Sequence, residues 1–157
     1  MRAALRSGAI FMAALAVLAI CGCADKGDPI RRSLDGMAKA AHNRDVGAFM
    51  RRVAQNFEAA DGSGRADAEA MLRRFFDAYE SLNVTIHDVS IERGENVARA
   101  RFRAELSGRP RRIGGLDGLL PSSTAYDFDL RLVRDGAAWK VAWASWNPAG
   151  ASPTYRE

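Results

Sequence analysis

The sequence has 157 residues, of which 48% are hydrophobic and 27% are charged. This length and composition are typical of one globular domain behind a short leader. The net charge is +4, from 23 basic and 19 acidic residues, and the two kinds are interleaved along the chain. The charge therefore gives no support for nucleic acid as a partner, and we expect none.

The first 22 residues are organised as an export signal. Arg2 and Arg6 precede an apolar run over residues 9–20 (AIFMAALAVLAI), which is too short to span a bilayer comfortably. The segment Ile20-Cys21-Gly22-Cys23 resembles the bacterial lipobox, in which a small residue stands immediately before the lipidated cysteine. Cys23 fits this pattern better than Cys21. If Cys21 were lipidated, Ile20 would occupy the position that a small residue takes in the lipobox. We therefore expect residues 1–22 to be removed and Cys23 to carry palmitate-like acyl chains.

Two alternatives to lipidation remain open at this stage. Gly22-Cys23-Ala24 could serve as an ordinary cleavage site, which would release a periplasmic protein, or the apolar run could stay as an uncleaved anchor. The resemblance to Gram-negative lipoproteins implies the periplasmic face of the outer membrane, because Ala24 rather than aspartate follows the cysteine. Without Arg2 and Arg6 the mature chain has 21 basic and 19 acidic residues, a net charge of +2.

The first half of the mature chain has helical periodicity. Residues 23–28 form a short tether, and Asp28-Pro29 is typical of a helix start. We expect a second helix to begin at Asn43 or Asp45 and a third to follow the turn at residues 60–64. The apolar residues of the second helix would be Val46, Phe49, Met50, Val53 and Phe57, and those of the third Met71, Leu72, Phe75, Phe76, Tyr79 and Leu82.

The second half changes to the period of two that is typical of strands. Residues 83–93 predict one strand, and Ala98 to Leu106 alternate with outward charged residues in the next. A third strand places Tyr126, Phe128, Leu130 and Leu132 inward, and the Asp135-Gly136 turn leads to Trp139, Val141 and Trp143 on the inner face. We therefore predict an α+β fold, with three N-terminal helices packed on a curved antiparallel sheet of about four strands.

Several segments are similar to the nuclear transport factor 2-like superfamily, whose cone-shaped fold is shared by ketosteroid isomerases, polyketide cyclases and many uncharacterised bacterial proteins. They are Asn56-Phe57-Glu58, Gly64-Arg65, residues 97–106 (VARARFRAEL) and residues 136–146 (GAAWKVAWASW). The resemblance covers residues 29–146 and implies a cone with an open end, but no particular activity. We expect residues 147–157 to form a disordered tail.

The inward aromatic residues could line a pocket at the open end of this cone. Pockets are mostly apolar with a few convergent polar groups, which tyrosine and tryptophan would supply, although most such residues in a small domain simply form its core. The candidates for the pocket are Phe49, Phe75, Tyr79, Tyr126, Phe128, Trp139 and Trp143. The sequence thus predicts a lipid-anchored envelope protein that binds a small apolar ligand or serves as accessory to an envelope complex, and that is not an enzyme.

The alternative is a hydrolase or isomerase of the cone-fold type that uses His87 with a carboxylate such as Asp88. Adjacent strand residues point to opposite faces, so this pair would need a bulge. His42, near a helix end, is favourable to the helix dipole. We therefore expect no catalytic residues, no metal site and no cofactor.

Two further features concern partners. Arg99, Arg101 and Arg103 face outward beside Asp127, Asp129 and Arg131; if their strands are neighbours, the opposite charges pair across the sheet. In the resembled superfamily this face often mediates dimerisation, and its charge here permits a polar homodimer. The long connection over residues 107–123 predicts a lid or partner loop, whose basic and apolar candidates are Arg109, Arg111, Arg112, Leu119 and Leu120.

Overall fold

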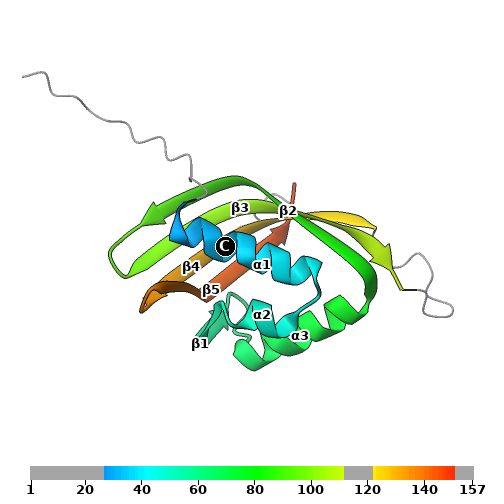
Figure 1. Cartoon of the computed structure of the whole chain (residues 1–157), viewed down its shortest axis with the longest axis horizontal. Helices are drawn as coiled ribbons and strands as arrows, with labels where there is room; N and C mark the ends of the chain where they lie inside the picture. The colour runs from blue at the N-terminus through cyan, green and yellow to red at the C-terminus, as the bar shows by residue number, and fades with distance from the viewer. Residues whose placement is uncertain (1–26, 112–121, 151–157) are drawn as a thin grey trace, which may run out of the picture.

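The computed structural model describes residues 27–111 and 122–150, and in this part three helices cover one face of a single sheet (Figure 1). The elements are α1 (Pro29–His42), α2 (Val46–Met50), β1 (Val53–Ala59), α3 (Arg65–Asp77), β2 (Tyr79–Arg93), β3 (Val97–Pro110), β4 (Ser123–Asp135) and β5 (Ala138–Pro148). Among these residues no helix has the length and hydrophobicity needed to cross a bilayer.

The sheet has five strands in the order β1-β5-β4-β3-β2. The strands β2 to β5 form an antiparallel meander, and β1 pairs in parallel with β5 at one edge. The predicted α+β architecture with three helices on a curved sheet is therefore confirmed. The predicted strand number was one too low, and the sheet is mixed rather than purely antiparallel.

Helix α1 begins and ends as its sequence dictates. The Asp28 side chain accepts hydrogen bonds from the backbone N–H groups of Ile30 (2.7 Å) and Arg31 (3.2 Å), and Pro29 occupies the first turn, where no donor is needed. At the other end the N–H of Arg44 donates to Ala41 O at 2.9 Å, and that of Asp45 to Ala40 O at 2.8 Å, which together form a Schellman motif. This motif requires a left-handed residue, and Arg44 takes that role with φ of 54°.

The second and third helices are shorter than their apolar periodicity predicts. Helix α2 ends at Met50, and the residues from Val53 to Phe57 belong to β1 because pairing with β5 satisfies their backbone groups. Helix α3 ends at Asp77, so that Tyr79 and Leu82 lie on the first residues of β2. In both places an apolar spacing of three or four residues fits a helix as well as the strand that forms.

The core lies between α1 and the central strands. Ala98 and Ala100 of β3 and Leu130 and Leu132 of β4 point inward as predicted, where they meet Ile30 and Leu34 of α1 together with Val141 of β5. The small alanines on β3 leave room for the helix to approach the sheet. Residues 135–138 close the predicted hairpin, with Gly136 at a φ of 61°.

Bulges in β2 and β5 interrupt the alternation of inward and outward side chains, in addition to the register shifts between Tyr79 and Ser81 of β2 and between Val53 and Glu58 of β1. In β2, His87 pairs with Arg103 and Ser90 with Arg101, so Asp88 and Val89 together oppose one residue, and Asp88 has a φ of 53°. In β5, Val141 pairs with Leu132 and Trp143 with Arg131, which leaves Ala142 as the extra residue. Beyond each bulge the inward positions shift by one residue along the strand.

Candidate functional site

A cavity of 270 Å³ lies between the three helices and the inner face of the sheet. The five strands form the floor of the cavity, and the helices form its roof. The side chains around it are Leu34, Met37, Ala38, Ala41, Phe49, Met50, Val53, Phe57, Ala68, Met71, Leu72, Phe75, Phe76, Leu82, Val84, Ile86, Phe102, Ala104, Leu106, Tyr126, Phe128, Leu130, Val141, Ala144 and Trp146. Met71 of α3, which is 41% exposed, marks where the cavity meets solvent.

An aromatic row crosses the floor of the cavity. Phe102, Phe128 and Trp146 are direct cross-strand neighbours on β3, β4 and β5. The rings of Phe102 and Phe128 stack with centroids 5.2 Å apart and planes 11° from parallel, and Trp146 continues the row 6.4 Å from Phe128. Tyr126 stands edge-on to Phe128 at 6.4 Å. The row lines the floor of the cavity with aromatic rings.

The wall of the cavity carries very few polar groups. Of the described residues that line it, only Tyr126 and Trp146 have a hydrogen-bonding side-chain group, the phenol O–H and the indole N–H. Tyr79 is buried beside Phe75, with ring centroids 5.1 Å apart. Burial raises the pKa of Tyr79, and the nearby Tyr126 raises it further. A ligand in the cavity would therefore meet hydrocarbon over most of its surface.

The structure brings four of the seven expected pocket residues to the cavity, namely Phe49, Phe75, Tyr126 and Phe128. Tyr79 packs just outside it, in a small cluster with Phe76 and Leu82. Trp139 is buried at the other end of the core, where its carbonyl accepts a hydrogen bond from Ser33 Oγ at 3.0 Å.

The expected inward position of Trp143 is wrong. The bulge at Ala142 turns Trp143 to the outer face, where its ring lies 5.3 Å from the guanidinium carbon of Arg131. The same shift brings Trp146 into the cavity, a residue that strict alternation from Trp139 would not have placed there.

Neither histidine lines the cavity. His87 is exposed on the outer face of β2, where its Nε2 lies 3.5 Å from Glu105 Oε2. The bulge at Asp88 places the Asp88 carboxylate on the same outer face as His87, beside Arg103. His42 is exposed at the end of α1. In the described part of the chain, no cluster of three or more His, Cys, Asp or Glu side chains could hold a metal ion.

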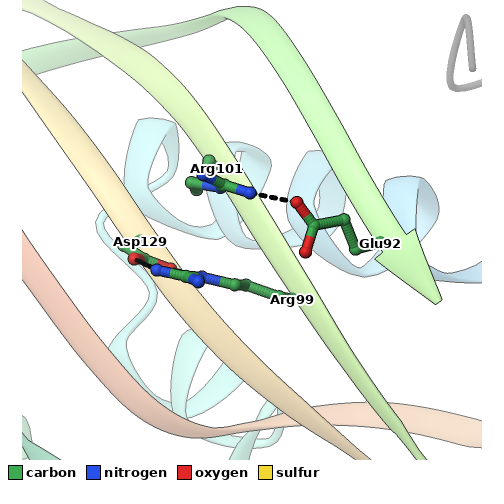
Figure 2. A network of polar contacts seen from close by, with 4 residues as sticks. All are labelled: Glu92, Arg99, Arg101 and Asp129. Carbon is green, nitrogen blue, oxygen red and sulfur yellow. Dashed lines mark hydrogen bonds and ion pairs between the residues drawn. The ribbon is translucent and has the colours of Figure 1, made fainter. Parts of the chain in front are cut away.

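The outward charges pair across the sheet as the sequence predicts. Figure 2 shows Arg99 in contact with Asp129 and Arg101 in contact with Glu92, each on a neighbouring strand. The hydrogen bond from Arg99 lowers the pKa of Asp129, against the effect of partial burial. Arg103 contacts Asp127 at 2.9 Å. These arginines already have carboxylate partners, so the face is a solvated network of ion pairs.

The remaining predicted site residues lie only partly within the described chain. Arg109 of β3 is exposed, with its Nη1 3.7 Å from Glu80 Oε2, and the backbone N–H of Arg111 donates to Ala78 O at 2.8 Å. Arg112, Leu119 and Leu120 of the expected lid, and Cys23 of the lipobox, lie outside the described residues. Strand β5 includes Asn147 and Pro148, which are the first two residues of the predicted tail.

Comparison with known proteins places the fold but no activity. No family model matches the sequence, and no curated protein matches it. A candidate scytalone dehydratase from Novosphingobium aromaticivorans is similar in structure, with a TM-score of 0.69 at 13% identity over 82% of this chain and 93% of the other. A candidate dehydratase of the nuclear transport factor 2-like family from Streptomyces avermitilis gives 0.66 at 12% identity, over 78% and 95%.

A third similar structure is Bd1075 from Bdellovibrio bacteriovorus, with a TM-score of 0.63 at 13% identity over 76% of this chain. The present chain spans 40% of the length of that protein. Identities this low carry no residue roles from one chain to another. These three structural similarities, together with the helices on a curved five-stranded sheet, show that the chain has the nuclear transport factor 2-like fold.

Proposed function

We propose that this chain is a lipid-anchored protein of the bacterial cell envelope that binds a small, neutral, apolar ligand in the cavity of its cone. The observation that carries the proposal is the composition of the cavity wall, in which hydrocarbon and aromatic side chains surround the two neutral donors of Tyr126 and Trp146. Binding sites for small molecules typically combine an apolar wall with a few polar groups that fix orientation.

The size of the cavity bounds the ligand. An apolar cavity of about 150 Å³ accepts benzene, so 270 Å³ corresponds to a molecule of about ten to twelve non-hydrogen atoms on that scale. Three methionines in the wall, Met37, Met50 and Met71, have flexible thioether side chains that can adapt to more than one shape. A planar or short-chain hydrocarbon skeleton with at most one polar group fits these walls.

Binding of a small neutral fluorescent probe, 1-naphthylamine, whose size lies within this bound and which carries one polar group, tests this ligand class. Ala104→Phe fills the cavity from β3, and Ala125→Phe adds the same volume to the outer side of β4. We expect the probe to bind the wild type and Ala125→Phe equally, and Ala104→Phe at least tenfold more weakly. Equal binding by both variants, each with a cooperative melting transition, would contradict the proposal.

The anchor rests on the lipobox at Cys23, and it is tested by the mass of the membrane-fraction protein. We expect loss of residues 1–22 and a gain of acyl chains, both abolished in Cys23→Ala. An unmodified soluble species in both samples would instead favour a diffusible periplasmic protein. In the same preparation, co-purification of a stoichiometric envelope protein would favour the accessory role over ligand binding alone.

The alternative of a cone-fold hydrolase or isomerase finds less support. Two similar structures carry the names of candidate dehydratases, and a base in the cavity would favour that chemistry here. His87, the residue that the alternative requires, lies on the opposite face of the sheet beside Glu105. A general base must reach the bound substrate, and His87 does not reach the cavity.

A further inference from the structure

We infer that the cavity opens away from the anchoring membrane, so that its ligand enters from the aqueous phase or from a partner there and not from the bilayer beneath. This inference rests on the proposed lipid anchor at Cys23. It also depends on which end of the domain follows the tether, and on which end the cavity opens.

The chain enters the domain at the end of the sheet where the two hairpins turn. Asp28, which caps α1, forms an ion pair with Arg93 at the tip of the β2–β3 hairpin. The β4–β5 hairpin lies against this tip, because the N–H of Arg134 donates to Asn96 O at 2.9 Å. These residues, with the first turn of α1, form what we call the anchor end, and Figure 1 shows both hairpins beside the start of α1.

The cavity lies toward the opposite end of the sheet. Its lining residues on the sheet come from the start of β2, the end of β3, the start of β4 and the end of β5, among them Leu106 and Tyr126. Helix α3, which carries the exposed Met71, contacts β1 and the β2 strand. The two exposed large hydrophobic residues of the described chain divide between the ends, with Met71 at the cavity mouth and Val97 (49% exposed) at the anchor end.

The length of the tether decides whether the domain could invert. Five residues, Ala24 to Asp28, separate Cys23 from α1 and reach at most about 17 Å when fully extended. Helix α1 runs from the anchor end to Arg44, whose side chain donates to Tyr79 O at 2.9 Å near the mouth. Its 14 residues span about 21 Å at 1.5 Å per residue. The tether is shorter than this helix alone, so the mouth cannot face into the bilayer that holds Cys23.

Thiol labelling of the membrane-inserted protein tests this orientation. The full chain has only two cysteines; Cys21 leaves with the leader and Cys23 is acylated, so one introduced cysteine can be labelled alone. Glu95→Cys and Ala137→Cys place a fluorophore at the anchor end, and Asp77→Cys and Ser81→Cys place it near the mouth. All four residues are exposed, and Glu95 and Asp77 form a matched acidic pair.

The labelled proteins are reconstituted into phosphatidylethanolamine–phosphatidylglycerol vesicles, some of whose headgroups carry a nitroxide quencher. We expect quenching to be several-fold stronger at Glu95 and Ala137 than at Asp77 and Ser81. Equal or stronger quenching at Asp77 and Ser81 in an acylated, vesicle-bound protein would overturn the orientation while leaving the anchor intact. Failure to find acyl mass or vesicle association would overturn the anchor, and the orientation with it.

Discussion

Gly108 of β3 pairs with Leu82 near the start of β2. A Cβ at this position would lie 2.4 Å from the carbonyl oxygen of Ser81 and 3.1 Å from Cδ1 of Tyr79. The first contact is with backbone of the paired strand, and the second is with a ring that is 3% exposed. Neither atom can withdraw by a simple rotation, so Gly108→Ala is expected to separate the two strands locally.

The cost follows from this geometry. Overpacking a well-packed site typically costs about 1–3 kcal/mol, and we place Gly108→Ala at about 2–3 kcal/mol because backbone must move. For a domain of this size, each kcal/mol lowers the melting temperature by about 3–5 °C. The expected shift is therefore about 10 °C in thermal unfolding followed by circular dichroism.

Two other glycines supply matched controls for the same substitution. Gly47 lies in α2, and a Cβ there would meet nothing closer than 3.4 Å, so alanine is expected to be neutral or to stabilise by up to about 1 kcal/mol. Gly62 has a φ of 85° and open space around it, so Gly62→Ala measures left-handed strain alone, about 1–2 kcal/mol. If Gly108→Ala lowers the free energy of unfolding no more than Gly47→Ala does, that result would contradict the close approach of β2 and β3 at Gly108.

Three further tests by urea denaturation concern the helix cap, the ion pairs and the bulge. Arg44→Ala and Arg44→Gly both lose the bond to Tyr79 O, but only alanine keeps the left-handed strain. Arg44→Ala is therefore expected to be less stable than Arg44→Gly by about 1 kcal/mol, and equal stability would contradict this. Asp129→Asn destabilises at neutral pH by less than about 1 kcal/mol because the carboxyl is partly exposed. Since folding lowers the pKa of Asp129 from 3.8, the difference from wild type should shrink below about pH 4, where the unfolded carboxyl is protonated; a difference constant with pH would refute the ion pair. Trp139→Ala, in the core, is expected to destabilise the domain by about 3–5 kcal/mol. Trp143→Ala loses mainly the contact with Arg131 and is expected to cost about 1 kcal/mol. A larger cost for Trp143→Ala than for Trp139→Ala would contradict the outward position of Trp143.

Local signals were sufficient for much of the fold. Asp28-Pro29 predicted the start of α1, and the Asp135-Gly136 turn predicted the β4–β5 hairpin, because each depends on residues close in sequence. The inward alanines of β3 followed from a period of two that the pairing with β4 keeps without interruption.

Elements that depend on distant partners were not predictable in the same way. Residues 53–59 form a strand because β5, over 80 residues later, supplies the parallel partner. Their apolar spacing of Val53 and Phe57 fits one helical face equally well. The end of α3 has the same ambiguity, since Tyr79 and Leu82 are three residues apart. Tertiary pairing, and not local propensity, decides these segments.

The candidate site was only partly predictable, in part because bulges in β2 and β5 change which residues face inward. Strict alternation through β2 would continue the inward set Val84 and Ile86 with Asp88, whereas the bulge brings Val89 and Ile91 toward the core instead. This shift is visible in the sequence as a change of phase in the apolar residues between positions 86 and 89. The resulting pattern is therefore a signal that predicts a bulge.

The bulge in β5 has the same effect on the cavity. Without the extra Ala142, the residues facing inward after Trp143 would be Ser145 and Asn147, which would put a hydroxyl and an amide at the floor. With it, Ala144 and Trp146 face the cavity, and Ser145 and Asn147 lie on the outer face. Because a slip of one residue exchanges every side chain between the two faces, the bulges in β2 and β5 are enough to turn the polar groups of both strands to the outer face of the sheet. The apolar character of the cavity, on which the proposed ligand class depends, is therefore a consequence of where these two strands break their register.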